Sequence, residues 1–526
     1  MKILMVAAEN GALAGGKVGG MGDVIRDIPR ALAELGHEVD VIMPGYQRFS
    51  TLPGSRPLSQ VTVNYRGKPQ TVQLFDVPAG STHPNVRCRV LEHPEFAAGG
   101  QGQIYCNDPP ERPFASDASK FALFCLGVSQ ALVNGALEHY QVIHLHDWHS
   151  ALLAVLIRLH RSYRSLGHMR LVYTIHNLSL QGIRPFEGDK SSLQAWFPEL
   201  ICEQGDLRDQ RFPQCYNPMR AAIRLCDRVH AVSPTYAGEI QSPSVPERGF
   251  VGGEGLENDL RQAAEQGRLK GILNGCEYPE TESSGSERRK QEILKETLAA
   301  MSEQLISWLA AKEELSSSQF LALRRLDRWN QAAKFNPRML VTSVGRLTEQ
   351  KAQLLRQPMG DGRSALEHLL DCLQGKAVLL VLGSGDAEYE RFFTEVCAHR
   401  DNLLFLKGYS ESMSEVLYRN GDLFLMPSSF EPCGISQMLS MRAGQLCLVH
   451  GVGGLLDTVE DNHTGFIFSG GSPIEQAQNM IERMQQILDL HTSDSAGWQA
   501  MKAAAKEQRF LWSDVANQYV QQLYEG

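Results

Sequence analysis

The chain has 526 residues and a mass of 58.4 kDa, which is long for one domain and comfortable for two of about 200–250 residues each. Hydrophobic residues make up 43% and charged residues 21%, a composition typical of a globular protein with a large core. The net charge of −9, from 51 basic and 60 acidic residues, argues against a dedicated nucleic-acid-binding protein, which needs a strongly basic face.

The first ten residues, MKILMVAAEN, are apolar only as far as Ala8 and then reach Glu9. This run is too short for the apolar part of a signal peptide and predicts a first β-strand instead. No stretch approaches the ~20 apolar residues of a membrane-spanning helix. The 11 cysteines are scattered without a CxxC pair, which favours a reducing compartment. We therefore expect a cytoplasmic protein with no membrane and no nucleic acid among its partners.

Short β-type runs alternate with amphipathic helical stretches along the chain. The predicted strands are, in chain order, Ile3–Ala7, Val39–Met43, Val142–His146, Leu171–Ile175, Val229–Val232, Met339–Val344, Ala377–Leu382, Leu403–Leu406, Asp422–Met426 and Leu446–Val449. The helix after the first strand carries Val24, Ile28, Ala31, Leu32 and Leu35 on one face. Such alternation predicts an α/β protein with two doubly wound parallel sheets. Ligands are expected at the carboxyl ends of the strands, in a central cleft that the two domains face.

Two segments interrupt this alternation. Residues Gln241–Gly255 are rich in Pro, Ser and Gly and predict a mobile surface loop. The segment from about Pro279 to Pro337 begins with TESSGSERRKQ and continues with Leu, Ala, Glu and Lys at helical spacing. It predicts an exposed loop that leads into one or two helices near the domain boundary.

A glycine-rich loop joins the first strand to its helix and contains Gly15, Gly16, Lys17, Gly19, Gly20, Gly22 and Asp23. Glycines let a backbone approach a ligand closely, a helix N-terminus offers free N–H groups, and Lys17 adds a positive charge. The loop therefore suits a phosphate, although its spacing matches neither a Walker A loop nor a GxGxxG fingerprint. A glycine turn with a solvated lysine explains the pattern equally well.

The run from His144 to His149 reads HLHDWH and ends a predicted strand. His144 and His146 alternate along that strand and share a face, at the edge where a parallel sheet binds ligands. A zinc site would need further His or Cys at ligand spacing, and none stands nearby. The sequence favours a hydrogen-bonded strand end, with no metal.

In the second half, Arg346 and Lys351 follow a strand and are placed to converge on one anion, although two surface cations would give the same pattern. Gly385 lies in a tight loop after the next strand. Glu431, Cys433 and Gly434 lie between a strand and a helix. Gly453 and Gly454 follow a further strand. The sequence has no nucleophile elbow, no DxD metal motif and no HExxH, so its best summary is a diphosphate held without metal or other cofactor.

Taken together, the motifs resemble the bacterial glycogen synthase and plant starch synthase family, which are retaining glucosyltransferases of the GT-B fold. The opening signature of the family matches Lys17 to Val24. The match continues in order through HDWH at 146–149, TIHNL at 174–178, VSPTY at 232–236, GILNG at 271–275, RLTEQK at 346–351 and FEPCG at 430–434. Trp512 and Tyr519 are similar to the family's C-terminal helix.

The resemblance implies an N-terminal Rossmann-like, acceptor-side domain at 1–265 and a C-terminal Rossmann-like, nucleotide-sugar domain at 266–504. The latter contains a helical insert near 281–337. The C-terminal helix at 505–526 is expected to cross back to the first domain.

The implied reaction transfers glucose from a nucleotide-glucose, usually ADP-glucose in bacteria, to the non-reducing end of an α-1,4-glucan with retention. By similarity, Lys17 and its glycine loop (Gly19, Gly20 and Asp23) meet the donor. Arg346 and Lys351 hold the diphosphate, and Glu431 binds glucose hydroxyls. His146 lines the sugar site, and no residue is a covalent nucleophile. The remaining residues assigned to substrate binding are Gln181, Asn274, Gly385, Cys433, Gly434, Gly453 and Gly454.

The sequence also departs from the family. Val452 stands where a Thr is usual, His450 and Ser429 where Arg is usual, and Ala352 where Gly is usual. The helical insert does not resemble the family at all. The departures keep open a non-catalytic glucan- or nucleotide-binding paralogue that regulates a synthase. They also keep open a transferase that uses UDP-glucose or a short-sugar acceptor.

Overall fold

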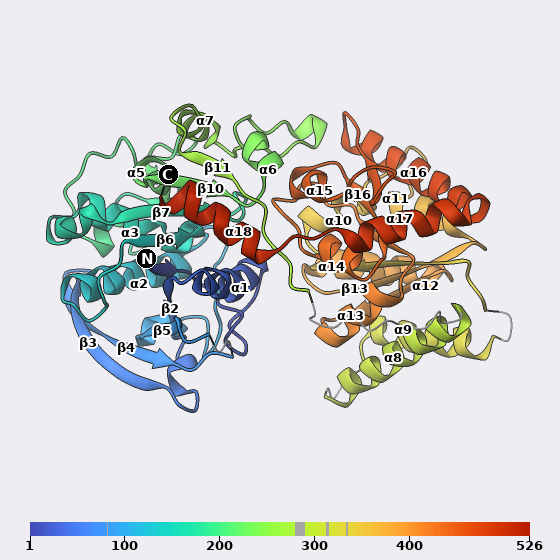
Figure 1. Ribbon diagram of the computed structural model, residues 1–526, viewed down its shortest axis with the longest axis horizontal. Coiled ribbons are helices and arrows are strands. Elements are labelled where there is room, and N and C mark those ends of the chain that lie inside the picture. Colours follow the sequence, from blue (N-terminus) through green and yellow to red (C-terminus); the bar gives the residue numbers. More distant parts are fainter. Residues whose placement is uncertain (81–82, 279–289, 312–314, 333–334, 526) are drawn as a thin grey trace. The chain divides into compact units, whose positions relative to one another are not determined.

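The computed structural model describes residues 1–80, 83–278, 290–311, 315–332 and 335–525. The chain forms two compact units (Figure 1). Unit 1 comprises residues 1–244, 252–275 and 511–526, and unit 2 comprises residues 245–251 and 276–510. The sequence places the domain boundary at 265/266 and the return of the chain at 505. In the structure the chain leaves unit 1 after residue 275 and returns at 511, because a further short strand at 269–271 still pairs within the sheet of unit 1.

Unit 1 is built on a nine-stranded sheet with the order β11-β10-β7-β6-β1-β2-β5-β4-β3 in the described residues. Its strands are β1 Lys2–Val6, β2 Glu38–Pro44, β3 Arg56–Tyr65, β4 Lys68–Val77, β5 Val86–Glu92, β6 Val142–His146, β7 Arg170–Ile175, β10 Arg228–Ala231 and β11 Leu269–Gly271; a separate ribbon pairs β8 Arg184–Pro185 with β9 Cys215–Tyr216. The parallel register sets Ile3 beside Val39 on one side and Val142 on the other. The parallel, doubly wound core that the sequence predicts is thus confirmed.

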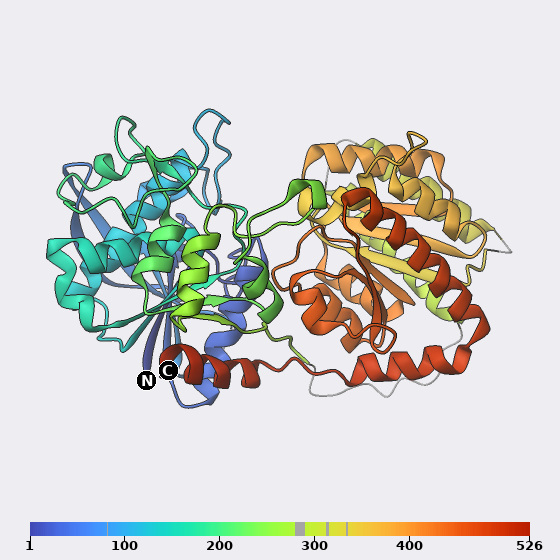
Figure 2. The same cartoon turned by 90° about the horizontal axis from the view of Figure 1, so that it is seen from above.

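Helices cover the two faces of this sheet (Figure 2). They are α1 Gly20–Glu34, α2 Ala115–Val133, α3 Asp147–Leu159, α4 Leu193–Trp196, α5 Pro218–Leu225, α6 Pro234–Glu239, α7 Glu257–Glu265 and α18 Trp512–Gln518, the last continued by a π-helical turn at Tyr519–Tyr524. In α1, Val24, Ile28, Ala31 and Leu32 are buried as predicted. Leu35 is the C-cap of α1 and is 40% exposed, so the predicted apolar face ends one turn earlier.

The hairpin β3–β4 and its antiparallel partner β5 are absent from the sequence prediction. Val61, Val63 and Tyr65 of β3 are buried while the residues between them are exposed. This period of two marks a sheet with one solvated face, whereas the predicted strands are continuous apolar runs buried on both faces. Continuous apolar runs therefore do not predict these three strands.

Unit 2 contains a parallel six-stranded sheet with the order β14-β13-β12-β15-β16-β17. Its strands are β12 Met339–Val344, β13 Ala377–Gly383, β14 Leu403–Lys407, β15 Leu423–Met426, β16 Leu446–His450 and β17 Gly465–Phe468. Its helices are α8 Lys290–Ala310, α9 Ser317–Gln331, α10 Glu349–Arg356, α11 Ala365–Leu373, α12 Ala387–His399, α13 Glu411–Asn420, α14 Ser436–Arg442, α15 Gly453–Thr458, α16 Pro473–Ser493 and α17 Ser495–Glu507. All ten strands predicted in the two halves are present, and their ends lie within one residue of the predicted ends.

The predicted helical insert forms the pair α8 and α9. A capping box begins α9, in which the Ser316 side chain accepts the backbone N–H of Gln319 while the Gln319 side chain bonds back to Ser316. The TESSGSERRK stretch predicted as an exposed loop lies mostly at 279–289, outside the described residues. The predicted loop at 241–255 contains a short 3₁₀ turn at Pro246–Arg248 and a bridge between Val245 and Phe250.

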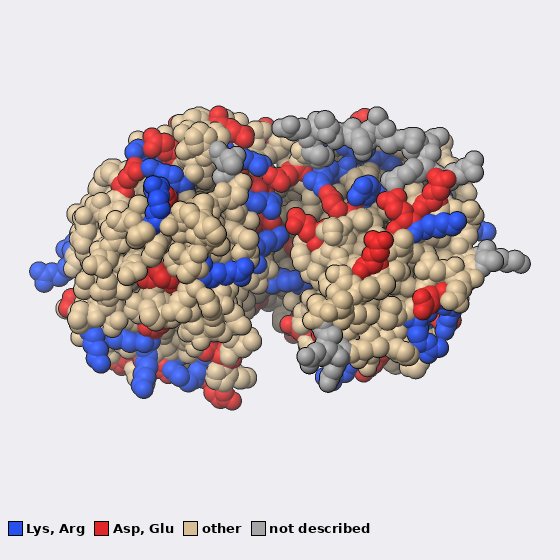
Figure 3. Space-filling view, turned by 90° about the horizontal axis from the view of Figure 1, so that it is seen from below, with Lys and Arg blue, Asp and Glu red and all other residues tan. Residues whose placement is uncertain are grey.

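The C-terminal segment belongs to unit 1, while α17 belongs to unit 2. Trp512 packs directly on Gly275, where a Cβ atom would lie 2.7 Å from the indole ring, so glycine is required there. Among the described residues, no helix is long and apolar enough to cross a membrane. Figure 3 shows basic and acidic side chains on both units rather than a face of one sign.

Candidate active site

The glycine loop of unit 1 is held from inside by a buried carboxylate. Oε2 of Glu9 accepts the backbone N–H groups of Val18 and Gly19, each at 2.7 Å, and Oε1 accepts the Tyr105 hydroxyl at 2.6 Å. Glu9 is only 3% exposed. Two of the N–H groups expected to meet a phosphate are therefore already bonded, so an anion at this loop would meet Lys17 and the N–H groups from Gly20 onward.

Lys17 lies at the rim of this loop with a partly solvated ammonium group. Its Nζ contacts Oδ1 of Asp23 at 2.6 Å, and Arg26 approaches the same carboxylate at 3.4 Å. Asp23 is in the first turn of α1, where a negative charge complements the helix dipole. Lys17, Gly19, Gly20 and Asp23 are thus brought together at one helix N-terminus, as the sequence predicts.

His146 ends β6 beside two other imidazole rings. His144 and His146 are fully buried, and His176 is partly buried. Its Nδ1 lies 3.0 Å from Nε2 of His176, and its ring stacks on His144 with centroids 4.4 Å apart. Burial holds the pKa of His146 well below its usual range and lowers the pKa of His176 to about 3. His146 Nε2 is buried without a hydrogen-bond partner. Within the described residues, no group of three or more His, Cys, Asp or Glu could hold a metal ion.

Asp147 makes the sharp turn from β6 into α3. Its φ of 54° lies in the left-handed region, and its Oδ1 accepts the backbone N–H of His176 at 2.7 Å. Burial raises the pKa of this carboxyl to about 7. Next to it, Trp148 packs against Gly182, where a Cβ would come within 2.1 Å of the indole. The strand end is therefore a tightly hydrogen-bonded turn.

A chain of hydrogen bonds next to His146 links His230 to Tyr524 in the C-terminal segment. The Nε2–H of His230 donates to the Ile272 carbonyl at 3.0 Å, which leaves Nδ1 to accept the Thr174 hydroxyl at 2.9 Å. Thr174 in turn accepts Nε2–H of His144 at 2.6 Å, and Nδ1 of His144 accepts the Tyr524 hydroxyl at 2.8 Å. Every ring in this chain is neutral, and none of these partnerships is visible in the sequence, because Tyr524 is 380 residues from His144.

Gln181 is buried, and its amide is fully committed within unit 1. Its Nε2 donates to the carbonyls of Leu178 and Glu254 at 3.1 and 3.0 Å. Its Oε1 accepts from Arg211 at 3.0 Å and from Asn217 at 2.6 Å. A substrate would reach the Gln181 amide only by displacing one of these bonds.

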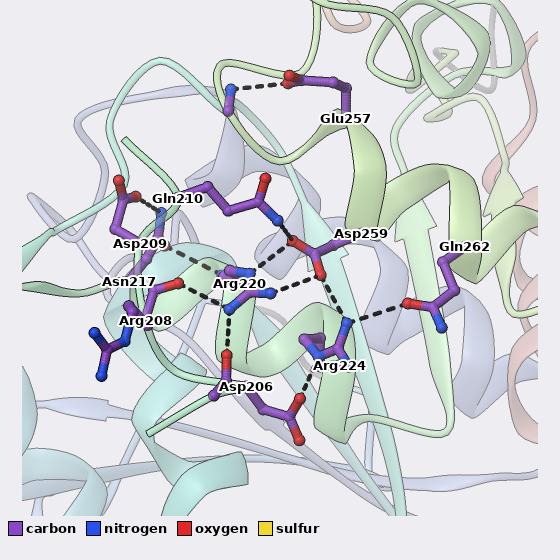
Figure 4. Close-up of polar contacts among 12 residues, drawn as sticks. Asp206, Arg208, Asp209, Gln210, Asn217, Arg220, Arg224, Glu257, Asp259 and Gln262 are labelled. Atoms are coloured by element: carbon purple, nitrogen blue, oxygen red, sulfur yellow. Dashed lines mark hydrogen bonds and ion pairs between the residues drawn. The ribbon is translucent and has the colours of Figure 1, made fainter. Parts of the chain in front are cut away.

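The same region is anchored by an ion cluster (Figure 4). Arg220 and Arg224 of α5 both pair with Asp259 of α7, at 2.7 and 2.8 Å. Asn217 caps α5 by accepting the backbone N–H of Arg220 at 3.1 Å. The paired charges explain how Asp259 can be buried, and they fix the segment from which Asn217 reaches Gln181. Asn274, the other assigned polar residue of unit 1, is buried with its Oδ1 unpaired.

Unit 2 gathers its charged residues at the carboxyl ends of β12 and β15. A pocket lies there, lined by Arg346, Lys351 and Ser428 among apolar neighbours. The Lys351 ammonium forms an ion pair with Glu431, whose Oε2 also accepts the Ser428 hydroxyl at 3.0 Å. Arg346 is exposed, and its guanidinium has no ion-pair partner in the described part of the chain. Arg346 and Lys351 thus line one pocket, and Glu431 contacts Lys351.

Glycines pack two loops against this centre. Gly454 lies on the backbone of Cys433, where a Cβ would be 2.3 Å from the Cys433 carbonyl oxygen, and its N–H donates to the Glu431 carbonyl at 3.0 Å. A Cβ built on Gly385 would likewise lie 2.4 Å from the Leu347 carbonyl oxygen. The close approach predicted at these glycines is therefore an approach of the chain to itself. Gly453 and Gly434 have φ values of 45° and 76°.

Three of the positions set apart from the family motifs lie around this centre, namely His450, Ser429 and Ala352. His450 Nδ1 is 2.8 Å from the Ser428 carbonyl oxygen, and its ring stacks on Phe468. The Ser429 hydroxyl donates to the Gln350 carbonyl at 3.1 Å, and Ala352 is buried in the pocket wall. The substituted side chains are therefore packed and bonded within unit 2.

Comparisons with known proteins agree with this arrangement. The family model of the starch synthase catalytic domain matches residues 2–262, and that of group 1 glycosyl transferases matches residues 327–493. The chain is 31% identical to the glycogen synthase of Streptococcus equi subsp. equi over 99% of its length and 98% of that protein. It is 31% identical to the glycogen synthase of Gloeobacter violaceus over 99% of its length and 97% of that protein.

Two solved structures share the fold. The catalytic domain of starch synthase IV from Arabidopsis thaliana, bound to ADP and acarbose, matches with a TM-score of 0.73 at 24% identity, over 99% of this chain and 98% of that one. A sucrose-phosphate synthase from Thermosynechococcus elongatus matches with a TM-score of 0.55 at 17% identity, over 99% and 97%. The chain belongs to the glycogen synthase and starch synthase family of retaining glycosyltransferases, and its fold is GT-B.

Proposed function

We propose that this protein transfers glucose from ADP-glucose to the non-reducing end of an α-1,4-glucan, with retention of configuration. The convergence of Arg346, Lys351 and Glu431 at the carboxyl edge of the unit 2 sheet carries the proposal. Two cations beside a carboxylate suit a sugar linked to a diphosphate, because the cations bind the phosphates and the carboxylate binds sugar hydroxyls. Support also comes from the starch synthase IV relative, which was solved with ADP and acarbose.

The cations act on the leaving group. As the glycosidic bond breaks, negative charge grows on the departing diphosphate, and Arg346 and Lys351 stabilise it. Lys351 is paired with Glu431 in the free protein, so donor binding exchanges this ion pair for contacts with phosphate and glucose. Ser428 holds Glu431 in place during the exchange through its hydrogen bond of 3.0 Å. The backbone at Gly385, Cys433, Gly434, Gly453 and Gly454 shapes the walls of the donor site.

Unit 1 contributes Lys17 with Gly19, Gly20 and Asp23 toward the donor, and His146 toward the sugar. A neutral His146 presents no positive charge to the cationic carbon that forms during transfer, so it does not oppose bond breakage. Attack on the same face of the sugar requires no covalent nucleophile, and none is assigned. We also assign the buried residues Asn274 and Gln181 to substrate binding.

The proposed compartment is the cytoplasm. All 11 cysteines are free, which suits the reducing cytoplasm. The donor and a glucan are the proposed partners.

Nucleotide release from ADP-glucose or UDP-glucose, with and without glycogen, tests the proposal. We expect glycogen-dependent ADP release that Glu431→Ala abolishes, while Glu460→Ala, an exposed glutamate, serves as the matched control. Faster release from UDP-glucose would correct the donor. No release by a folded protein that still binds glycogen would favour the regulatory paralogue, and release with maltotriose alone would favour a short-sugar acceptor.

A further inference from the structure

The helix pair α8–α9 contacts the edge strand β14 at both ends. At its start, Arg325 of α9 donates to the carbonyls of Leu403 and Cys397 at 3.1 and 2.9 Å. At its far end, α8 contacts the turn at residues 408–410 that joins β14 to α13. The pair therefore packs against the edge of the unit 2 sheet (Figure 1).

Two side chains of α8 fix the turn at 408–410. The indole of Trp308 covers Gly408, where a Cβ atom would lie 2.7 Å from the ring. The Ser410 hydroxyl donates to Oε1 of Gln304 at 2.6 Å. Because Ser410 also caps α13 and Gly408 donates its N–H to Gly383 at 3.1 Å, the turn is held from α8, α13 and β13 at once. Tyr409 between them is 62% exposed.

The strand order places this turn beside the proposed donor site. Arg346 follows β12, Glu431 follows β15 on one side of β12, and β13 and then β14 lie on the other side. In a nucleotide sugar the diphosphate joins the sugar to the nucleoside. If Glu431 takes the sugar and Arg346 the diphosphate, the nucleoside extends the other way, across β13 toward β14. Two strand spacings amount to roughly 9.6 Å, a span that a nucleoside diphosphate covers.

We propose that Trp308 and Gln304 are positioning residues for the donor: by fixing the turn at 408–410, helix α8 sets the affinity for the nucleoside half of the nucleotide sugar. The inference rests on the proposed function for the direction in which the donor lies. It gives the helix pair a role in substrate binding, although neither side chain touches the reacting atoms.

Binding of ADP and of inorganic pyrophosphate to the full-length protein, measured by calorimetry, tests the proposal. Pyrophosphate has no nucleoside, so it reports the cation site alone. We expect Trp308→Ala and Gln304→Ala to weaken ADP binding by about 10-fold and about 5-fold, the scale of a lost packing or hydrogen-bonding contact. Both should leave pyrophosphate binding within about 2-fold, consistent with intact Arg346 and Lys351.

Matched variants separate positioning from damage to the fold. Ile306→Ala removes an exposed apolar side chain from the same helix and should change neither affinity. Trp308→Phe keeps a ring over Gly408 and should restore most of the ADP affinity, and it replaces Trp308→Ala if that variant does not fold. In turnover assays of Trp308→Ala and Gln304→Ala, KM for ADP-glucose should rise, while KM for glycogen and kcat stay near the values of the unaltered protein.

Two results would overturn the inference. Unchanged ADP affinity in both α8 variants, with normal transfer, would remove the role of the helix pair and leave the proposed function intact. Equal weakening of ADP and pyrophosphate would assign the effect to the cation site. If the unaltered protein bound pyrophosphate but no ADP, or released no nucleotide from ADP-glucose, the proposed donor itself would be wrong and this inference would fall with it.

Discussion

The two units prepare their charged and polar groups in opposite ways. In unit 1, two N–H groups of the glycine loop are already bonded to Glu9, and burial holds His144 and His146 in the neutral form. In unit 2, Arg346 is exposed and Lys351 is held by one carboxylate beside an open pocket. Unit 1 therefore presents groups whose hydrogen bonds are already made within the unit. In unit 2, a bound donor has to replace the ion pair between Lys351 and Glu431.

The largest effect should come from unit 2. Lys351→Ala removes a cation from the leaving group, so we expect turnover to fall by about 10²–10³-fold, the scale of losing one preorganised electrostatic contact. Steady-state rates with glycogen measure it, and circular dichroism checks the fold. Lys376→Ala, at the amino edge of the same sheet, is the control lysine. Near-normal turnover in Lys351→Ala would remove the distinction between the units.

Acid should unfold unit 1 before unit 2. Burial lowers the pKa of His230 to about 4 and of His176 to about 3, below their ordinary 6.5. The unfolded chain takes up these protons below pH 6.5 and the folded chain does not, so stability is complete above pH 6.5 and decreases as pH falls. The expected loss is about 2 kcal/mol per histidine at pH 5. Asp147 offsets about one histidine's share, because burial raises its folded pKa to about 7 and its protonation stabilises the folded state as pH falls.

Hydrogen exchange between pH 7 and pH 5 measures this difference unit by unit. In the described part of unit 2, His450 is the one histidine buried to a similar degree, so its sheet should keep its protection longer. Equal loss of protection in both sheets would contradict the prediction.

A smaller effect should follow from Glu9→Gln. The substitution keeps the shape of Glu9 and one oxygen that can still accept the N–H groups of Val18 and Gly19. It removes the negative charge that strengthens both bonds, and it turns an NH₂ group toward the Tyr105 hydroxyl. We expect kcat/KM to fall by about 10-fold through a displaced Lys17 loop. Tyr105→Phe, which removes only the hydroxyl partner of Glu9, should cost less. An unchanged kcat/KM in Glu9→Gln would show that the loop needs no internal carboxylate.

The smallest expected effect is an improvement in donor binding. Val452 is the N-cap of α15 and makes no capping hydrogen bond through its side chain. Val452→Thr supplies a hydroxyl that can accept a helix N–H or donate to a phosphate, so we expect KM for the donor to fall by up to about 5-fold. Val452→Ala is the control without a hydroxyl. A rise in KM with Thr would indicate that the pocket has repacked around Val452.

Much of this molecule could be predicted from its residues. The continuous apolar strands and the motif residues at their carboxyl ends were found because each signal is local. The half-exposed strands β3–β5 were missed, since their apolar residues alternate. The pairing of Lys351 with Glu431, 80 residues away, and of Glu9 with Tyr105 was also missed. Such partners are set by tertiary packing, and only the motif spacing indicated that the cations converge.

The course of the chain has a consequence for biosynthesis. The larger part of unit 1 ends at residue 275, and residues 511 onward complete the unit. There Tyr524 completes the chain of hydrogen bonds through His144, Thr174 and His230. Domains normally fold in the order of their synthesis. Here residues 276–510, nearly all of unit 2, leave the ribosome before the last helix of unit 1 has been made. The unit begun first is therefore finished last, and the nascent protein carries a first sheet without its C-terminal helix until Trp512–Gln518 and Tyr524 are made.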